Sequence, residues 1–195
     1  MYNVGLTGGI GSGKTLVGNI FSTFGIPVFC ADEKAKELYD TNEIVRTELI
    51  KLLGSDIYIE NKLQRKRMAQ KIFSNPELLQ KVNNLVHPIL CEQFLQFSAQ
   101  QQSPYVLLEA AILFESKLDK QMQKIITITA SETIRLKRVA QRDKTSEEAI
   151  RERMRHQWTD EQRAAVADFI ITNDEQQALL PQIIKIHEQL LADAI

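Results

Sequence analysis

The stretch Gly8-Gly9-Ile10-Gly11-Ser12-Gly13-Lys14-Thr15 decides the fold of this sequence. It matches the pattern G-x-x-x-x-G-K-[ST], in which the backbone N–H groups of a glycine-rich loop wrap the phosphates of a nucleotide. The apolar residues 4–6 before the loop predict a buried strand, and the apolar residues of 17–24 after it recur at helical spacing. This order of strand, loop and helix predicts a phosphate-binding loop.

The loop itself supplies most of the groups that a nucleotide needs. Lys14 can reach the β- and γ-phosphates as a positive charge, and the hydroxyl of Thr15 can ligate a Mg²⁺ that bridges them. The positive end of the following helix points at the same anion. We therefore expect ATP and Mg²⁺ as cofactors. The predicted nucleotide-binding residues are Gly8, Gly9, Ile10, Gly11, Ser12, Gly13, Lys14, Thr15 and Leu16.

The distribution of glycine excludes one large class of nucleotide-binding proteins. Seven of the eight glycines lie in the first 25 of the 195 residues, and Gly54 is the only later one. A regulatory GTPase needs a D-x-x-G switch, but Lys51 stands where that aspartate would be. A translocating ATPase or helicase would carry a basic track for nucleic acid, and the net charge of -1 argues against one.

The rest of the chain alternates between strands and helices. Four more short apolar runs predict strands, at 27–30, 105–108, 125–129 and 168–172. Residues 33–100 are expected to be mostly helical, with breaks at 54–56, 75–76 and 87–88. A short helix is expected between the strands at 105–108 and 125–129, a helix capped by Ser131 through 141, and a closing helix over 175–192. Thr145 with Glu148 fits a capping box that opens another helix.

This alternation favours a parallel sheet that is covered by helices on both faces. The expected fold class is α/β, a P-loop NTPase fold with a central parallel sheet flanked by helices, plus a helical acceptor-binding region and a helical lid. We expect one domain over 1–195. Its core would be about 1–32 and 104–195 with the lid at about 138–160, and the acceptor region would be about 33–100.

Two carboxylates stand at predicted strand ends, on the edge of the sheet that bears the loop. Asp32 could position or deprotonate an acceptor hydroxyl, or could equally be the N-cap of the next helix. Glu109 could orient Mg²⁺ through water, or could be a half-buried strand-end glutamate. His87 is expected to pack and to hydrogen-bond rather than to react.

Three arginines, Arg135, Arg138 and Arg142, are spaced to share one helical face. Further arginines at 151, 153 and 155 lie on the next predicted helix. Such a pair of helices could form a lid that closes over ATP and excludes water. For any single arginine, a solvated face balanced by nearby glutamates is the alternative.

The ordered set of motifs resembles the dephospho-CoA kinases over nearly the whole chain. The similar segments are 6–14, Ala31-Asp32 with Ala35-Lys36, 63–65 with 72–76, Val86-His87-Pro88, 109–115, Arg135-Leu136 with Arg138, Arg142-Asp143, Gln157, and 167–173. Three residues depart from the family pattern: Cys30 replaces an aspartate, Lys36 an arginine and Ala111 a proline. Lys36 keeps the charge but loses the planar fork of arginine.

The resemblance implies an enzyme that moves the γ-phosphate of ATP to the ribose 3′-hydroxyl of dephospho-CoA, the last step of coenzyme A synthesis. It implies catalytic roles for Asp32, Lys14 and Arg138, and an ATP contact for Arg142. Thr15 and Glu109 would hold the metal. Two alternatives stay open: another P-loop kinase for a nucleoside monophosphate or a small alcohol, and a nucleotide-dependent binding module with no acceptor.

Composition adds expectations about location and partners. The N-terminal residues show no charged leader followed by a long apolar run, so a cytoplasmic protein is expected. The near-zero net charge predicts small-molecule partners, with no nucleic acid and no membrane. The chain is expected to be a monomer or a small homo-oligomer.

Overall fold

The computed structural model describes residues 1–73 and 75–194, apart from the side chain of Phe73. The chain forms two compact units. The first contains Met1–Cys30 together with the chain from Gln96 onward, and the second contains Ala31–Leu95. The expected acceptor region, about 33–100, includes Ser74, which lies outside the described residues.

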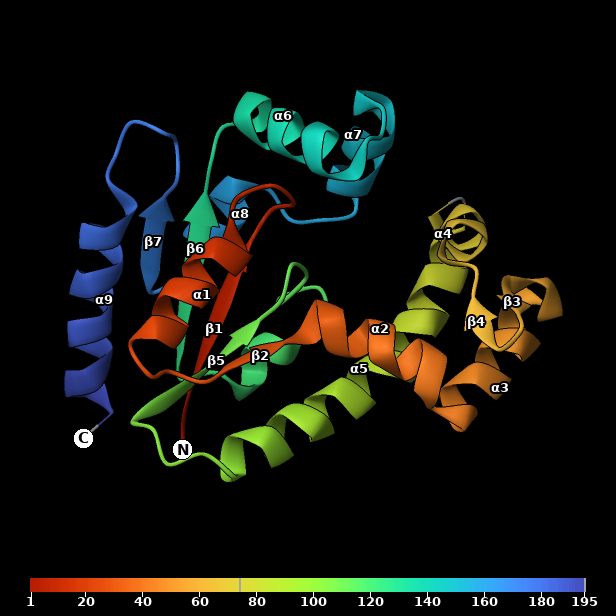
Figure 1. Ribbon diagram of the computed structural model, residues 1–195, viewed down its shortest axis with the longest axis horizontal. Coiled ribbons are helices and arrows are strands. Elements are labelled where there is room, and N and C mark those ends of the chain that lie inside the picture. The colour runs from red at the N-terminus through yellow and green to blue at the C-terminus, as the bar shows by residue number, and fades with distance from the viewer. Residues whose placement is uncertain (74, 195) are drawn as a thin grey trace. The chain divides into compact units, whose positions relative to one another are not determined.

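A five-stranded parallel sheet forms the centre of the first unit, in the order β2-β5-β1-β6-β7 (Figure 1). Its strands are β1 (Tyr2–Gly8), β2 (Val28–Cys30), β5 (Tyr105–Glu109), β6 (Lys124–Thr129) and β7 (Phe169–Thr172). β1 lies in the middle, and every residue of β5 is buried. A parallel sheet covered on both faces needs such continuous apolar strands, so the expected α/β fold class is confirmed.

Helices and turns of the first unit connect these strands. They are α1 (Lys14–Thr23), the 3-10 helix η2 (Leu118–Gln121), α6 (Glu132–Asp143), α7 (Glu147–Arg155), α8 (Asp160–Ala164) and α9 (Leu179–Asp193). Figure 1 shows α9 beside α1 and β7. On that face of the sheet, Val17 and Phe21 of α1 and Ile183 of α9 are buried in one cluster with Val4 and Leu6 of β1. This packing fixes the direction in which α1 leaves the loop.

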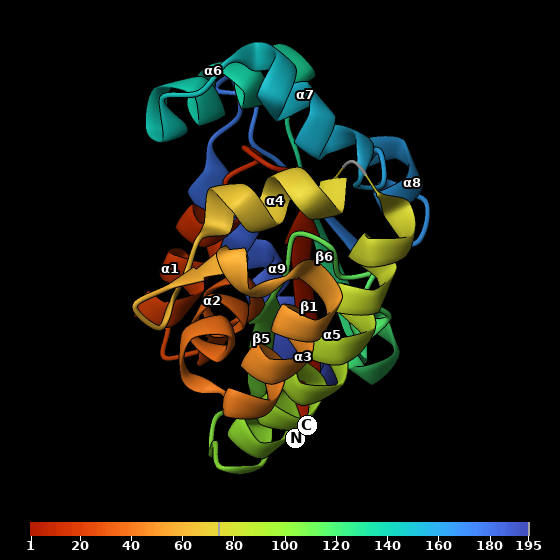
Figure 2. The same cartoon turned by 90° about the vertical axis from the view of Figure 1, so that its right-hand side faces the viewer.

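The second unit has its own apolar cluster. Its elements are α2 (Ala31–Thr41), α3 (Glu43–Leu53), the 3-10 helix η1 (Ser55–Ile57), β3 (Tyr58–Ile59), β4 (Lys62–Leu63), α4 (Arg65–Phe73) and α5 (Pro76–Ala99), whose last turn belongs to the first unit. Leu38, Leu49 and Val86 bring α2, α3 and α5 together in this cluster (Figure 2). No helix of the described residues is long and apolar enough to cross a membrane.

The expected break at 87–88 is wrong, because α5 continues through Pro88. Proline inside a helix removes one hydrogen bond and costs about 3 kcal/mol. Val82, Val86 and Leu90 follow one another at a spacing of four residues and are all buried. Their burial stabilises the helix by roughly 1.5–3 kcal/mol each, so packing outweighs the proline.

The region 33–100 also contains an antiparallel hairpin that helical periodicity did not predict. β3 pairs with β4, and the two turn residues, Glu60 and Asn61, both have positive φ angles of 48° and 66°. Positive φ at both central positions is the geometry of a tight hairpin turn. The sequence signal typical of such a turn is Asn-Gly or Asp-Gly, and Glu60-Asn61 does not match it.

Three helices of the first unit differ from the prediction in where they begin or how long they are. The N-cap of α7 is Ser146 and not Thr145, because the Ser146 hydroxyl accepts a hydrogen bond from Ala149 N. The helix expected between β5 and β6 is only the single 3-10 turn η2. The closing helix begins at Leu179, four residues later than expected. The cap of α6 by Ser131 is confirmed.

Candidate active site

The phosphate loop joins the end of β1 to the start of α1 at the carboxyl edge of the sheet. Gly8, Gly11 and Gly13 have φ angles of 152°, 82° and 100°, which side chains disfavour. Gly13 is the N-cap residue of α1 and has no side chain to cap the helix. The first N–H groups of α1 therefore face the loop, which is the arrangement that binds anions.

Lys14 is held by the loop that precedes it. Its Nζ donates hydrogen bonds to the carbonyl oxygens of Gly8, at 3.0 Å, and Gly9, at 3.4 Å. The residue is only 8% exposed. The loop thus curls round a buried positive charge, and the structure brings the predicted residues 8–15 together at one place.

Glu109 lies beside Thr15, as expected from its place at the end of β5. The Thr15 hydroxyl donates to Glu109 Oε1 at 2.8 Å, and Cys30 Sγ donates to Oε2 at 3.5 Å. Cys30 and Glu109 are also register partners on β2 and β5. A hydroxyl and a carboxylate are oxygen ligands that suit Mg²⁺.

The oxygen donors in contact beside the loop are Thr15 and Glu109. Among the described residues, no group of three or more His, Cys, Asp or Glu side chains is placed to hold a metal ion. Mg²⁺ at nucleotide sites commonly uses one or two protein oxygens together with phosphate oxygens and water. Thr15 and Glu109 are enough for a site of that kind.

Two amides fasten the loop from outside. Gln157 Oε1 accepts a hydrogen bond from Ile10 N at 2.9 Å, and Asn173 Nδ2 donates to Ser12 O at 2.7 Å. The sequence placed both residues in family-like motifs but gave no role to either. Their contacts bring the segment before α8 and the end of β7 against the loop.

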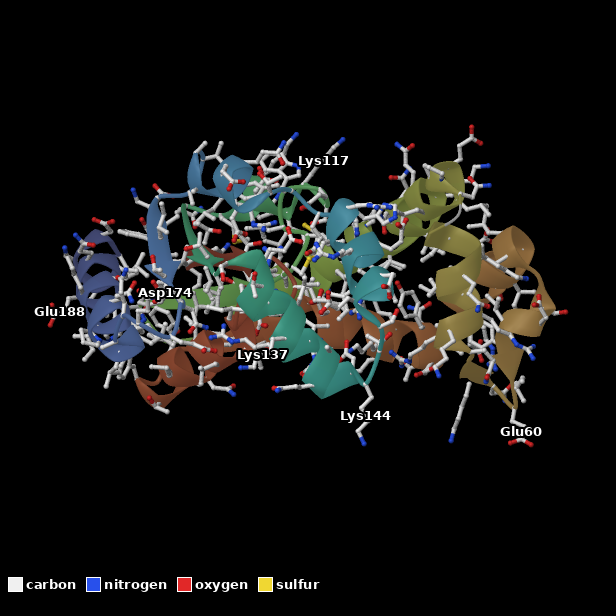
Figure 3. All side chains as sticks on the ribbon, turned by 90° about the horizontal axis from the view of Figure 1, so that it is seen from above. Glu60, Lys117, Lys137, Lys144, Asp174 and Glu188 are labelled. Carbon is white, nitrogen blue, oxygen red and sulfur yellow. The ribbon has the colours of Figure 1, made fainter. Side chains whose placement is uncertain are left out.

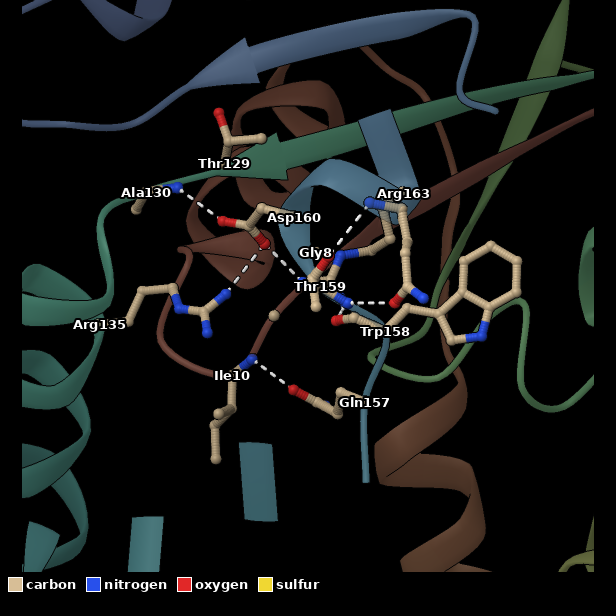
Figure 4. A network of polar contacts seen from close by, with 12 residues as sticks. Gly8, Ile10, Thr129, Ala130, Arg135, Gln157, Trp158, Thr159, Asp160 and Arg163 are labelled. Atoms are coloured by element: carbon tan, nitrogen blue, oxygen red, sulfur yellow. Dashed lines mark hydrogen bonds and ion pairs between the residues drawn. The ribbon is translucent and has the colours of Figure 1, made fainter. Parts of the chain in front are cut away.

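Sequence reasoning missed a buried ionic cluster next to Gly9. Arg163 of α8 is 1% exposed, and its guanidinium group hydrogen-bonds Asp160 and the carbonyl oxygen of Trp158 (Figure 4). Arg135 Nη1 donates to the same Asp160 at 2.9 Å. The capping pattern of Thr159 and Gln162 was a usable signal for α8, but nothing local predicted the arginines' partner.

The three lid arginines do not share one environment. Arg135 is 9% exposed and donates to Asp160, whereas the lid expected from the three arginines stays a prediction. Arg138 Nη2 donates to Asn173 Oδ1 at 3.4 Å and to Glu175 Oε1 at 3.1 Å. Lys137 is exposed, and Lys144 at the end of α6 points outward (Figure 3). Arg138 is thus linked, through Asn173, to the loop.

Arg142 is exposed and forms an ion pair with Asp143, the last residue of the same helix, α6. Its Nε and Nη2 donate to Asp143 at 2.7 and 3.2 Å, and Arg153 of α7 donates to the same carboxylate. The hydrogen bond from Arg142, with help from Arg153, lowers the pKa of Asp143 to about 2. The same bond raises the pKa of Arg142. The Arg142 pair lies within α6, and Arg153 links α7 to the end of α6 through Asp143.

Asp32 and Leu16 are both exposed, unlike Lys14 and Glu109. Asp32 belongs to the second unit and is exposed in the first turn of α2, which begins one residue earlier, so it is not the N-cap. A carboxylate there suits the positive helix end. Leu16, in the first turn of α1, is 54% exposed. The roles expected for both residues stay predictions.

Comparisons with known proteins agree on one family. The family profile described as dephospho-CoA kinase matches residues 2–178. A dephospho-CoA kinase of Porphyromonas gingivalis is 40% identical over 189 residues, covering 96% of this chain and 94% of the relative. The solved dephospho-CoA kinase of Campylobacter jejuni superposes with a TM-score of 0.70 at 25% identity, over 99% of this chain and 98% of that one. A solved Thermus thermophilus protein gives 0.83 at 27% identity, over 98% and 97%. The chain therefore belongs to the dephospho-CoA kinase family.

Proposed function

We propose that this chain transfers the γ-phosphoryl group of ATP to the ribose 3′-hydroxyl of dephospho-CoA, with Asp32, Lys14 and Arg138 as its catalytic residues. The family catalyses the last step of coenzyme A biosynthesis. The observation that carries the proposal is the contact of Thr15 with Glu109 beside the Lys14 loop. It supports the proposal because phosphoryl transfer needs oxygen ligands for Mg²⁺ and a positive charge near the phosphates.

In the proposed reaction, the ribose oxygen bonds to the γ-phosphorus while the bond from that phosphorus to the β–γ bridging oxygen breaks. ADP keeps the electron pair of the broken bond. Lys14 and the loop N–H groups neutralise the phosphate oxygens, and Asp32 accepts the proton of the hydroxyl. For a loose transition state, this positioning and charge neutralisation supply most of the catalysis.

Thr15 and Glu109 would hold Mg²⁺, whose positive charge would neutralise phosphate oxygens of ATP. Thr15 would offer its hydroxyl, and Glu109 would offer its carboxylate. The orientation of the Glu109 carboxylate is fixed, because Thr15 and Cys30 donate hydrogen bonds to its two oxygens. Such supporting hydrogen bonds orient the ligands of metal sites.

Arg138 and Arg142 would complete the site from α6. Arg138 is tied to Asn173, whose amide holds the loop at Ser12, so it is the better placed of the two. Its Nη1 is buried and has no hydrogen-bond partner among the described residues. A guanidinium group with a spare donor beside the loop suits an anionic ligand.

The same proposal includes a cytoplasmic enzyme with small-molecule partners. Twenty-four basic and twenty-five acidic residues leave no excess of positive charge for nucleic acid or for an anionic membrane surface. ATP and dephospho-CoA are the proposed substrates, and the working form is a monomer or a small homo-oligomer.

Acceptor profiling with labelled ATP tests this function. Dephospho-CoA should exceed AMP and simple alcohols in kcat/KM by at least about 100-fold, because a site that hydrogen-bonds its acceptor rejects analogues that lack those groups. Asp32→Asn should lower kcat by roughly 100- to 10,000-fold, the usual contribution of a general base, with ATP affinity unchanged. Lys14→Ala should lose turnover and weaken ATP binding.

The matched control is Glu33→Gln, which removes the neighbouring exposed carboxylate of the same helix. It should leave kcat and both KM values near those of the wild type. Better phosphorylation of AMP than of dephospho-CoA would contradict the acceptor assignment. Equal losses in the Asp32 and Glu33 variants would contradict the role of Asp32.

A further inference from the structure

Asp160, the first residue of α8, joins three elements around one carboxylate. Its Oδ1 accepts hydrogen bonds from Arg135 Nη1 of α6, at 2.9 Å, and from Arg163 Nη2 of α8 itself. Its Oδ2 accepts from Ala130 N, just after β6, at 3.4 Å (Figure 4). Asp160 is thus the counter-ion of two arginines and is also tied to the backbone at the end of the central sheet.

Both guanidinium groups lie against the phosphate loop at Gly9. A Cβ atom built on Gly9 would stand 2.7 Å from Arg135 Cζ and 2.9 Å from Arg163 Nη2. Gly9 has no positive φ angle, so a side chain there would be opposed by the two guanidinium groups and not by the backbone conformation. The arginines therefore form a wall that sets where the loop backbone runs.

The next residue of the loop is held by the same segment. Ile10 N donates to Gln157, and Trp158 O, one residue further on, accepts from Arg163 Nη1. Trp158 N donates to Glu115 at 2.6 Å, and its ring stacks on Phe114 with centroids 4.7 Å apart. The segment is thus anchored independently of the loop that it supports.

Asp160 is the carboxylate that neutralises the two buried arginines. Arg163 and Arg135 are 1% and 9% exposed, and a buried guanidinium group without a counter-ion is strongly unfavourable. Without the carboxylate, the two positive groups would repel each other at short range. The lowest-cost relief is for one of them to move away from Gly9, and the loop would then lose its wall.

We propose that Asp160 is a positioning residue for phosphoryl transfer. Through Arg135 and Arg163, it holds the loop backbone at Gly9 and Ile10 in the shape that binds the phosphates of ATP. The inference rests on the proposed function only for its kinetic consequence, because the effect on ATP binding needs no acceptor. Misplacing a reacting group by about 1 Å can cost roughly 100-fold in rate.

The test is Asp160→Asn, which keeps the size of the side chain and removes its charge. We expect kcat/KM for ATP to fall by roughly 10- to 100-fold and the ATP dissociation constant, measured by calorimetry without acceptor, to rise by about tenfold. The KM of dephospho-CoA should stay unchanged. Removing one of the unpaired charges in Asp160→Asn/Arg135→Gln should recover part of the ATP affinity, since a neutral pair can still hydrogen-bond.

Glu132→Gln is the matched control. Glu132 also pairs with an arginine, Arg151, across α6 and α7, but the pair is exposed and no described contact joins it to the loop. Its ATP affinity and kcat should equal those of the wild type. If Asp160→Asn lowers only the unfolding free energy and keeps ATP affinity and kcat, Asp160 is merely structural and the proposal is overturned.

A second variant covers the case in which Asp160→Asn does not fold. Arg163→Lys keeps the charge next to Asp160, but a single ammonium group cannot also reach Trp158 O in the same fork geometry. We expect a several-fold loss of ATP affinity with an unchanged KM for dephospho-CoA. Wild-type ATP affinity in this folded variant would overturn the proposal. Failure of the wild type to phosphorylate dephospho-CoA would instead contradict the proposed function.

Discussion

Glu109 lies at the end of β5 with 7% of its surface exposed, and it accepts one hydrogen bond on each carboxylate oxygen. One donor, Thr15, comes from α1, and the other, Cys30, comes from β2. By the resemblance noted in the sequence, the Cys30 thiol stands at a position where an aspartate is usual, which would mean one negative charge fewer next to Glu109. The metal proposal therefore depends on Glu109 more strongly than it would with two carboxylates.

Glu109→Gln should raise the Mg²⁺ concentration that gives half-maximal activity by roughly 10- to 100-fold, as supporting residues of metal sites do. The amide keeps the shape and can still accept from Thr15, but it loses the charge that attracts the cation. ATP affinity without metal should change little. Activity titrations with Mg²⁺ measure the shift.

Glu188→Gln is the control for this titration, since Glu188 is exposed on α9 and points away from the unit (Figure 3). It changes the net charge by the same amount without touching the site. A Mg²⁺ titration of Glu109→Gln that superposes on that of the control would exclude Glu109 from the metal site.

At the scale of single elements, α6 and α7 show how capping decides where a helix starts. The sequence offered Thr145 with Glu148 as a capping box, but the Ser146 hydroxyl accepts from Ala149 N at 3.3 Å. Ser146→Ala should lower the free energy of unfolding by about 1 kcal/mol. Urea unfolding followed by tryptophan emission measures it, because Trp158 is the only tryptophan.

Thr145→Ala is the matched control and should change the unfolding free energy by less than about 0.5 kcal/mol. If this substitution cost more than Ser146→Ala, the cap would be Thr145, as the sequence alone suggested. Such a result would also move the start of α7 by one residue.

Elements with strong local signals were predictable, and contacts between distant residues were not. The glycine loop, the five strands of the central sheet and the Ser131 cap follow from neighbouring residues. The continuation of α5 through Pro88 depends on packing partners elsewhere in the second unit. The Asp160 cluster joins residues 25 positions apart in the chain, and no periodicity announces such a pairing. Thr159 with Gln162 forms the capping box of α8, a signal that neighbouring residues do carry.

At the scale of the whole molecule, the nucleotide half of the proposed site lies within the first unit. Loop, Glu109, α6 and Asp160 all belong to it, whereas Asp32 lies in the second. The stability of the first unit therefore bears directly on ATP binding. His187 of α9 contacts two residues of this unit: its Nδ1 lies 2.7 Å from the Tyr105 hydroxyl, and its ring stacks on Phe24 with centroids 5.0 Å apart.

Burial lowers the pKa of His187 below its ordinary value of 6.5. As the pH falls through 6.5, the unfolded chain takes up the proton first, because the folded histidine resists it. Stability is thus fully present above about pH 7 and is lost as the pH falls through the lowered pKa of the folded state. Each unit of pKa difference corresponds to about 1.4 kcal/mol.

We therefore expect the unfolding free energy of the first unit, followed by Trp158 emission between pH 7.5 and 5.5, to decrease with falling pH, and His187→Gln to flatten that dependence. Glutamine can still hydrogen-bond the Tyr105 hydroxyl but does not titrate. Asp143, whose pKa is about 2, stays ionised over this range and adds no slope of its own. His87, whose pKa is also lowered by burial, lies in the second unit, so His87→Gln is the matched control. An unchanged slope in His187→Gln, or a slope abolished by His87→Gln alone, would show that His187 does not link the stability of this unit to pH.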